Sequence, residues 1–190
     1  MKKMNPKAIL IPTITLVLIC LISTALLAVT NMVTSEKIAL NAVETEKASR
    51  MIVLPDAAEF SEVTTLDSGI TYCTATDKNG ETAGYVFTAG AKGYGGTVNV
   101  MVGLDLKGVI TGIEILSHSE TPGLGANATS DSFKSRFAGK SGELTVDKNS
   151  NEGQNIQAIT AATITSKAVT NAVNSITAAF NEISGGENNG

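Results

Sequence analysis

Histidine and cysteine are scarce in this chain, which has one histidine and two cysteines among its 190 residues. Cys20 lies inside a long apolar run and Cys73 stands alone in the remaining sequence, so neither a disulfide framework nor a CxxC or metal–thiolate site is indicated. A zinc site needs more ligands than one histidine supplies. His118 would need an orienting carboxylate and a nucleophile to act as a catalytic base, and the sequence identifies no such arrangement. The sequence therefore predicts neither a metal site nor a catalytic residue.

Basic residues are also few once the N-terminus is set aside. Three of the 14 lysines and arginines, Lys2, Lys3 and Lys7, precede the first acidic residue, Glu36. The rest of the chain carries 11 basic and 18 acidic side chains, a net charge of −7. Binding to a nucleic-acid backbone needs clustered cationic side chains, so nucleic acid is not an expected partner.

An apolar run without charge extends from Ile9 to Val29. Its 21 residues span about 31 Å as a helix, which is enough to cross a hydrocarbon core of roughly 30 Å. We interpret residues 9–32 as a transmembrane helix in the lipid bilayer and residues 1–8 as a short segment before it. A cleaved signal peptide is the alternative, but its apolar region is usually about 7–15 residues long, and no clear small-residue cleavage site follows this run.

The lysines around this run predict its orientation. Lys2, Lys3 and Lys7 precede it and no other lysine follows until position 37, so the positive-inside rule places the N-terminus in the cytoplasm. A lipoprotein anchor at Cys20 is disfavoured because bulky Ile19 precedes it and the apolar run continues beyond it. We therefore expect a single-pass protein of the inner (cell) membrane with its remaining residues on the extracytoplasmic side.

Beyond the span, the pattern predicts a polar stalk helix and one α+β domain. The stalk covers residues 33–55 and ends at Leu54-Pro55-Asp56, because proline disfavours helix in the residue before it. The domain is expected at residues 56–184, with antiparallel sheet and packed helices. A flexible tail is expected at residues 185–190.

Alternating residues and turn signals predict a small antiparallel sheet in that domain. One hairpin runs from 70 to 88 around an Asn-Gly turn at 77–80, and a second joins 97–104 to 109–116 at 105–108. Because no βαβ repeat is present, a doubly wound fold is not expected. Three further elements are expected: a short helix at 130–137, a strand at 144–146 and an amphipathic C-terminal helix that ends before Gly185.

Two loops have more than one interpretation. The loop Gly90–Gly96 matches neither a dinucleotide-binding fingerprint nor a Walker loop, which leaves a tight strand connection or a close approach of backbone to a planar ligand. The loop Ser117–Gly125 is either held by local turns or faces a ligand through Glu120, Thr121 and the backbone around Gly123. The residues alone do not separate these alternatives.

The stretch Ile159–Ser166 places four hydroxyl residues among small ones just before the last helix. A helix start has backbone N–H groups without intrahelical partners and the positive end of the helix dipole, so it suits a phosphate. Its hydroxyls can either cap the helix or be modified.

Three motifs, in this order, resemble a known family. They are Gly-Tyr-Gly-Gly at 93–96, His-Ser-Glu-Thr-Pro-Gly-Leu-Gly at 118–125, and Gln-Ala-Ile-Thr-Ala-Ala-Thr at 157–163 followed by Ile-Thr-Ser. Together with the single N-terminal span, they resemble the FMN-binding domain of the Rnf complex G subunit over nearly the whole chain. The C subunit of sodium-translocating NADH:quinone reductase shares this domain but is usually longer, so the length favours Rnf.

The resemblance implies a redox cofactor and its attachment site. In this family the last threonine of the motif Asp-x-x-Ser/Thr-Gly-Ala-Thr is joined to FMN by a phosphoester bond, which a separate flavin transferase forms from FAD. The matching residue is Thr163. The other expected cofactor-binding residues are Thr160, Ala162, Thr165, Glu120, Thr121, Leu124 and Gly125, with His118 and Lys134 as further candidate neighbours.

The resemblance also implies a partnership and a role. The partners would be the other subunits of the Rnf complex, with the flavin transferase needed for maturation. The mature subunit would relay electrons inside an ion-translocating ferredoxin:NAD⁺ oxidoreductase, as a redox subunit that catalyses no reaction itself.

Two residues depart from the family motif. Gln157 stands where the pattern has aspartate, and Ala161 stands where it usually has glycine. Loss of the carboxylate would weaken recognition by the transferase, and alanine would restrict the turn if the position needs a positive φ. Neither change removes the acceptor hydroxyl, so we expect Thr163 to carry FMN. The alternatives are a membrane-anchored structural or assembly subunit without flavin, in which Thr163 and Thr165 only cap the helix, and the FMN subunit of a related quinone reductase.

Overall fold

The computed structural model describes the backbone of residues 6–187 and their side chains, apart from those of residues 6–9, 36, 39, 40, 42 and 185–187. The expectations for Lys2, Lys3 and residues 188–190 lie outside this part of the chain. The chain forms two compact units, which divide after Glu44.

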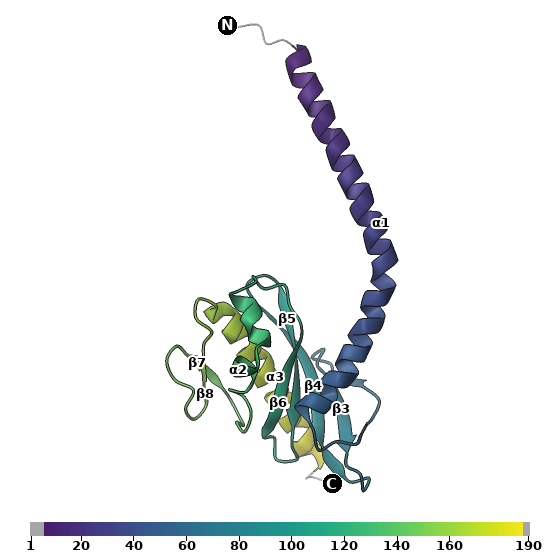
Figure 1. Cartoon of the computed structure of the whole chain (residues 1–190). Helices are drawn as coiled ribbons and strands as arrows, with labels where there is room; N and C mark the ends of the chain where they lie inside the picture. The colour runs from purple at the N-terminus through teal and green to yellow at the C-terminus, as the bar shows by residue number, and fades with distance from the viewer. Residues whose placement is uncertain (1–5, 188–190) are drawn as a thin grey trace. The chain divides into compact units, whose positions relative to one another are not determined.

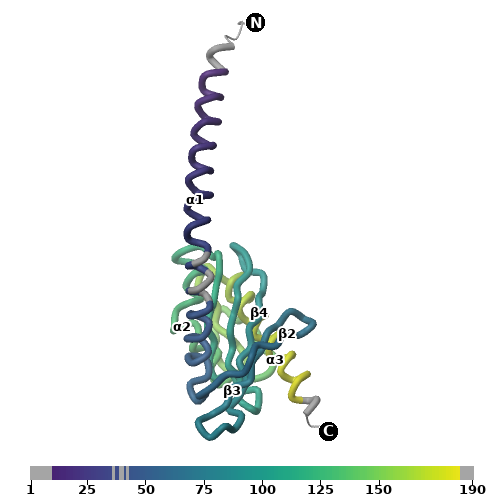
Figure 2. The backbone as a smooth tube through the Cα atoms, turned by 90° about the vertical axis from the view of Figure 1, so that its right-hand side faces the viewer, coloured from purple at the N-terminus to yellow at the C-terminus, as the bar shows by residue number. Residues whose placement is uncertain are grey.

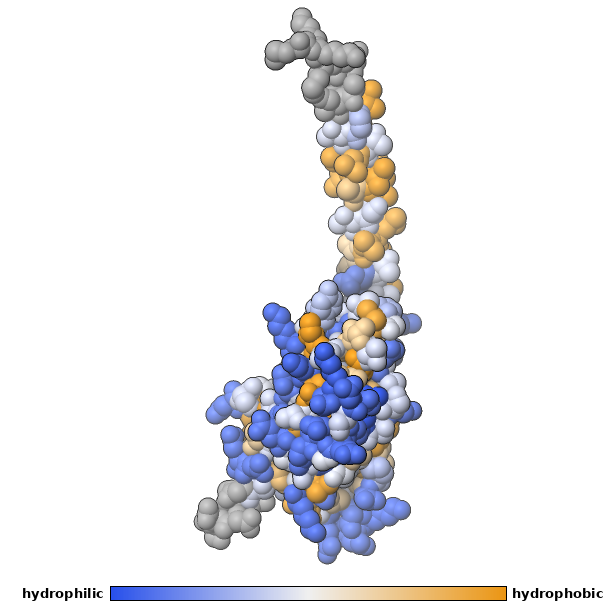
Figure 3. Space-filling model, turned by 90° about the vertical axis from the view of Figure 1, so that its left-hand side faces the viewer, coloured by the Kyte–Doolittle hydropathy of each residue, from blue (hydrophilic) through white to orange (hydrophobic). Residues whose placement is uncertain are grey.

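The first unit is helical throughout its described part. Helix α1 runs Pro6–Val53, so its last residues belong to the second unit. Between Leu10 and Ser35 it is long and apolar enough to cross a membrane, and every side chain of this stretch is exposed (Figure 3). The Thr24 hydroxyl donates to the Cys20 carbonyl oxygen at 2.7 Å, which gives this polar group a partner inside its own helix. The helix has no break between residues 32 and 33, so the boundary between span and stalk stays a prediction.

The second unit is an α+β domain, as the sequence predicts (Figure 1). The strands are β1 Glu59–Phe60, β2 Thr64–Thr65, β3 Thr71–Thr76, β4 Thr82–Lys92, β5 Thr97–Leu104, β6 Ile110–Ser117, β7 Thr145–Asp147 and β8 Asn155–Gln157. The helices after α1 are the 3-10 helix η1 Gly125–Thr129, the short helix α2 Asp131–Lys134 and the long helix α3 Thr163–Glu187.

The larger sheet is antiparallel in the order β1-β3-β4-β5-β6, with β2 also paired to β3. Both predicted hairpins, β3–β4 and β5–β6, are confirmed. Their turns are held by aspartates: Asp77 Oδ1 accepts the backbone N–H of Asn79 at 2.8 Å, and Asp105 Oδ1 accepts that of Lys107 at 2.8 Å. Strands β7 and β8 form a separate parallel pair.

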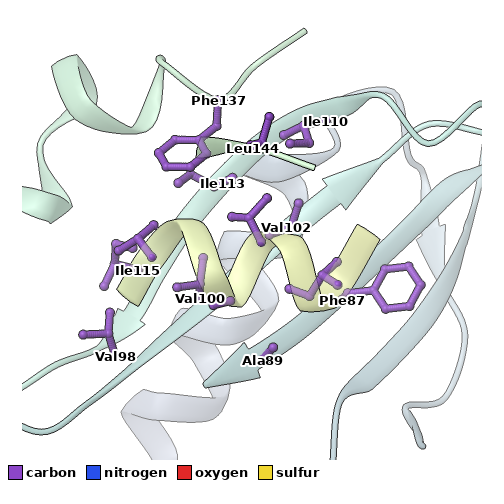
Figure 4. Packing of buried hydrophobic residues seen from close by; sticks show 14 of the residues in the cluster. Phe87, Ala89, Val98, Val100, Val102, Ile110, Ile113, Ile115, Phe137 and Leu144 are labelled. Atoms are coloured by element: carbon purple, nitrogen blue, oxygen red, sulfur yellow. The ribbon is translucent and has the colours of Figure 1, made fainter. Parts of the chain in front are cut away.

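The main core lies between one face of this sheet and α3. Alternate strand residues such as Phe87, Val100 and Val102 are fully buried and belong to one cluster with Val173 and Ile176 of α3. Figure 4 shows the strand side chains gathered around the helix. Because apolar residues recur on one stripe of α3, the sheet holds this helix along its length.

The opposite face of the sheet is covered by the end of α1 and the segment that follows (Figure 2). Val53 is buried there with Val86 and Met101, which alternate along their strands with the residues that face α3. Gly103 makes this approach possible, because a Cβ on Gly103 would overlap the Val53 carbonyl oxygen. The hydroxyl of Thr111 donates to the same oxygen at 2.5 Å.

Helix α3 also holds the chain that leads into the smaller sheet. The side-chain amide of Asn174 accepts the N–H of Leu144 at 2.9 Å and donates to the carbonyl oxygen of Leu144 at 2.8 Å. Leu144 is itself buried in the main core. Strand β7 begins at the next residue, one position later than the predicted strand.

Two predicted boundaries are wrong by several residues. Strand β4 continues to Lys92, so only residues 93–96 form the loop expected at Gly90–Gly96. Helix α3 continues through Gly185 to Glu187, so the predicted helix end before Gly185 is wrong, while the flexibility of the tail stays a prediction.

The helix expected at 130–137 is also shorter than predicted, because α2 covers four residues. After Lys134 the chain turns, and Gly139 N donates to the carbonyl oxygen of Ile110 at 2.8 Å, at the start of β6. Phe133 and Phe137 still pack together, with their ring centroids 5.4 Å apart, as the four-residue spacing indicates. The last expected helical turn is thus replaced by tighter turns, in which Arg136 N donates to Phe133 and Phe137 N to Lys134, before the chain reaches β6.

Candidate functional site

A cavity of about 520 Å³ opens where three segments of the domain meet. They are the turn between β4 and β5, the loop after β6 and the start of α3. This volume lies within the range of roughly 300–1,000 Å³ that is common for small-molecule and cofactor sites. The lining residues are Tyr94, Glu120, Thr121, Leu124, Gly125 and the run Ala161, Ala162, Thr163, Ile164 and Thr165.

The turn between β4 and β5 is built from glycine. Gly93 N donates to the carbonyl oxygen of Gly96 at 2.7 Å and closes the turn. A Cβ on Gly95 would overlap the backbone of Ser119, so this position brings the turn against the loop after β6. Tyr94, between these glycines, is 73 % exposed and lines the cavity.

The chain enters α3 through a tight turn. Ala162 N donates to the carbonyl oxygen of Ile159 at 2.9 Å, and Ala161 between them has a φ of 61°. Among the described residues, Ala161 is the one non-glycine residue with a positive φ. Ser166 fastens the turn from the helix side: its Oγ accepts the N–H of Ile159 at 2.9 Å and donates to the carbonyl oxygen of Ala162 at 3.0 Å. The condition under which alanine restricts this turn is therefore met.

The four hydroxyls near the start of α3 have different surroundings. Those of Ser166 and Thr165 are buried and engaged, Ser166 in the turn and Thr165 as a donor to Glu120 Oε2 at 2.5 Å. Thr160 is exposed and lines a neighbouring cavity of about 660 Å³. Thr163 is half-buried and lines the first cavity, and its hydroxyl has no hydrogen-bond partner in the described part of the chain. Of these four hydroxyls, Thr163 is thus the one that is both inside this cavity and unengaged.

Backbone N–H groups are also available at this place. Thr163 is the first residue of α3. Within the described residues, the N–H groups of Thr163, Ile164 and Thr165 have no acceptor, whereas that of Ser166 already donates to Ala162. Together with the helix dipole, these donors favour an anion beside Thr163.

Glu120 places a buried carboxylate in the same site, since the residue is 6 % exposed. Its Oε1 accepts the N–H groups of Tyr94 at 2.8 Å and Gly95 at 3.0 Å, and its Oε2 accepts the Thr165 hydroxyl. Burial raises the pKa of this carboxyl, but the hydrogen bonds from Thr165, Gly95 and Tyr94 outweigh that effect. The pKa lies below its ordinary value, so Glu120 is ionised at neutral pH.

The cavity brings together all of the predicted cofactor-binding residues except Thr160. The two further candidates do not line it. His118 Nδ1 accepts the backbone N–H of Glu120 at 3.2 Å. Lys134 Nζ instead forms an ion pair with Glu114 at 2.8 Å.

Three lining residues were absent from the predicted set: Tyr94, Ala161 and Ile164. Tyr94 carried a usable signal, because a lone aromatic residue within a glycine turn has no core to pack against. Ile164 is 55 % exposed although it belongs to the amphipathic α3, and its exposure depends on the segments around it rather than on its position in the sequence.

Gln157, one of the two departures from the motif, lies outside the main cavity. It ends β8 opposite Asp147 of β7. Its carbonyl oxygen accepts a hydrogen bond from the guanidinium of Arg136 at 2.5 Å, and its N–H donates a hydrogen bond to Asn151 Oδ1 at 3.3 Å. The residue lines the neighbouring cavity together with Thr160.

Two family models match the chain. The one described as an FMN-binding domain matches residues 93–178, which include every residue that lines the cavity. The one described as the RnfG N-terminal region matches residues 1–50.

Known proteins are similar over most of their length. The G subunit of the proton-translocating ferredoxin:NAD(+) oxidoreductase complex of Clostridium ljungdahlii is 36 % identical, over 98 % of this chain and 99 % of that protein. The G subunit of the Na(+)-translocating complex of Acetobacterium woodii is 43 % identical, over 84 % of this chain and 85 % of that protein.

A solved structure has the same fold. The crystal structure of NqrC from Shewanella oneidensis aligns with a TM-score of 0.50 and 19 % identity, over 63 % of this chain and 64 % of that one. This likeness supports the α+β architecture alone. The sequence identities and the two matching family models carry the assignment further: the chain belongs to the Rnf complex G-subunit family and contains an FMN-binding domain.

Proposed function

We propose that this chain is the electron-relay subunit of an ion-translocating ferredoxin:NAD⁺ oxidoreductase and that it carries FMN through a phosphoester bond to Thr163. One observation carries the proposal: Thr163 alone, among the hydroxyls at the start of α3, lies in the cavity with its oxygen unengaged. Family membership supports the same role, because the relatives are named as subunits of such complexes.

The residues present fit FMN at both of its ends. The free N–H groups at the start of α3 suit a phosphate on Thr163. Tyr94, Leu124 and Ile164 are exposed and line the cavity, so they offer apolar surface to a planar ring system. The bound FMN would supply the redox chemistry, while the chain would supply attachment, orientation and electrostatic surroundings. The domain therefore acts as a redox subunit of the larger enzyme and needs no catalytic residue.

The apolar helix anchors the chain in the membrane, and we propose that its N-terminus is cytoplasmic. The lysines before the span, with no further lysine until position 37, support this orientation. The FMN-binding domain then lies on the extracytoplasmic side, where a covalent bond keeps the cofactor from being lost. A flavin transferase on that side would attach FMN, and the other Rnf subunits would exchange electrons with it.

The alternative of a flavin-free structural subunit rests on Gln157 and Ala161. Ala161 adopts the left-handed conformation that the motif glycine permits, so the turn into α3 keeps its shape despite the side chain. Gln157 lies in the neighbouring cavity and does not touch the space beside Thr163. Neither departure removes the Thr163 hydroxyl from the cavity, which favours the flavin-carrying function.

Co-expression of the full chain with a flavin transferase tests the proposal. Intact mass should increase by one FMN phosphoester, and the protein band should fluoresce in a denaturing gel. Thr163→Ala should abolish both signals, whereas Thr160→Ala serves as the control and should retain them. An unmodified wild-type chain that is colourless when purified would support the flavin-free alternative and overturn the assignment.

A further inference from the structure

We propose that Glu120 is the positioning residue of this site. Its carboxylate joins the glycine turn at 93–96 to the first turn of α3 and so fixes the wall of the cavity. The same bond holds the Thr165 hydroxyl inward, so that Thr163 alone presents its hydroxyl to the cavity from this helix turn. This role rests on the proposed function where it concerns bound flavin. The joining of the two segments itself can be measured on the chain without flavin.

The two carboxylate oxygens of Glu120 serve different elements. Oε1 accepts two adjacent N–H groups of the glycine turn, those of Tyr94 and Gly95. Oε2 accepts the hydroxyl of Thr165, 45 residues further along the chain. One side chain therefore connects the β4–β5 turn to α3, and the turn needs an acceptor because it presents backbone N–H groups.

Glycines make room for this carboxylate. A Cβ on Gly93 would overlap Glu120 Oε1. A Cβ on Gly125 would come within 2.5 Å of Glu120 Oε2 and of the Thr165 hydroxyl oxygen. The backbone of two different loops thus approaches Glu120 closer than any residue with a side chain allows, which shows that the surroundings are fitted to the carboxylate.

The connection also determines which hydroxyls remain available. Thr165 is 2 % exposed and donates its proton to Glu120, so it faces inward from the first turn of α3. Thr163, two residues earlier, makes no such bond and faces the cavity. Glu120 therefore determines the orientation of Thr163, the proposed site of flavin attachment, through its bond to Thr165. It does not contact the Thr163 hydroxyl.

A fixed negative charge beside the cavity has a second consequence for bound FMN. Reduction adds negative charge to the flavin, and a nearby carboxylate in surroundings of low dielectric opposes that change. Removing the charge should therefore raise the reduction potential of the flavin. A purely structural role for Glu120 would not move the potential in a fixed direction.

Glu120→Gln is the most informative variant, because an amide keeps the size of the side chain but removes the charge that strengthens these hydrogen bonds. The amide oxygen can still accept from the glycine turn while the NH2 group donates to the Thr165 hydroxyl, so both connections become neutral and therefore weaker hydrogen bonds. Thr165→Val removes the bond to α3 alone and keeps the charge, which provides a second variant if Glu120→Gln folds poorly. Glu143→Gln is the matched control, since Glu143 is exposed and does not line the cavity.

The first measurement is hydrogen–deuterium exchange on the full chain in detergent, made without the transferase. In Glu120→Gln, the hydrogen-bonded amides at 93–95 and those of Ala162 and Ser166 should exchange at least about tenfold faster than in the wild type. Thr165→Val should show the faster exchange mainly at 162–166, and Glu143→Gln should show none. Unchanged exchange in both site variants would overturn the proposal whether or not flavin binds.

The second measurement is a spectroelectrochemical titration of the flavin-loaded chain. Glu120→Gln should have a higher midpoint potential than the wild type, while Glu143→Gln should match the wild type. An equal or lower potential in Glu120→Gln would contradict the electrostatic part of the proposal. If the wild type carries no flavin while the exchange rates respond as expected, the proposed function fails and the positioning role of Glu120 stands.

Discussion

Ala161 adopts a left-handed backbone conformation, with a φ of 61°, two residues before Thr163, the unengaged hydroxyl at the start of α3. The turn that presents the proposed flavin acceptor therefore contains backbone strain that glycine would not have. The strain is balanced by the surrounding bonds from Ser166 and Ala162.

Ala161→Gly should stabilise the domain. A left-handed alanine costs about 1–2 kcal/mol relative to its favoured conformations, and Ala161→Gly relieves this strain. Glycine is more flexible in the unfolded chain, which reduces the gain in stability by about 0.5–1 kcal/mol. We expect a net gain of about 0.5–1 kcal/mol in the free energy of unfolding, measured with urea on the detergent-solubilised chain. Ala178→Gly, at an exposed position of α3, should instead lose about 1 kcal/mol. A loss of stability in Ala161→Gly would contradict this account of the turn.

The stability of the domain should depend on Glu120 in a pH-dependent way. The folded-state pKa of this carboxyl is lowered, so its contribution is complete above the unfolded value of about 4.3 and is lost as pH falls towards the folded pKa. The difference in unfolding free energy between the wild type and Glu120→Gln should therefore shrink on acidification. Backbone N–H groups also lower the pKa of Asp77 and Asp147, but both carboxyls are present in each protein and cancel in the difference. A difference that grows towards low pH would count against the hydrogen-bonded carboxylate.

Gly103→Ala should weaken the contact between the end of α1 and the sheet. The new Cβ would overlap the Val53 carbonyl oxygen and come within 2.5 Å of the Thr111 hydroxyl oxygen, and overpacking of this kind costs about 1–3 kcal/mol. Gly69→Ala is the comparison: it has open space around its Cβ and a φ of 79°, so it should lose only about 1 kcal/mol from backbone strain. Equal losses in the two variants would mean that the Val53 contact adapts without cost.

Lys134→Met should affect stability and leave flavin loading unchanged. Burial lowers the pKa of the Lys134 ammonium, but its hydrogen bonds to Glu114 and Asp131 outweigh this and hold the pKa above its ordinary value. Removing the ammonium leaves the Glu114 side chain, 17 % exposed, without this partner, at a cost of about 1–3 kcal/mol. Lys148→Met, at an exposed position, should cost less than about 0.5 kcal/mol. Reduced flavin loading in Lys134→Met would contradict this prediction and support the earlier hypothesis that Lys134 lies beside the cofactor.

The parts of the fold that the sequence predicted well are those with local causes. The Asn79-Gly80 and Lys107-Gly108 turns fix the two hairpins through residues next to one another in the chain. Pro55 follows the end of α1 by two residues, which agrees with the predicted stop. The apolar period of α3 identified its buried face.

The parts that were missed depend on contacts between distant segments. β1 and β2 have two residues each, too few for a periodic pattern. Residues 135–137 form turns just before Gly139 and Lys140, which hydrogen-bond to Ile110 at the start of β6. The bond from the Thr165 hydroxyl to Glu120 was not predicted, because no local rule relates positions 45 residues apart. The motifs thus located the site, but its internal bonding required the fold.

Asn174 gives α3 an effect on assembly that goes beyond packing. A strand end with free N–H and carbonyl groups is a template for pairing with another polypeptide. The Asn174 amide occupies both groups of Leu144 just before β7 begins, much as a neighbouring strand would. The core helix α3 thereby covers the edge of the parallel β7–β8 pair at Leu144. The backbone groups of Leu144 are therefore not available for edge-to-edge pairing with another chain.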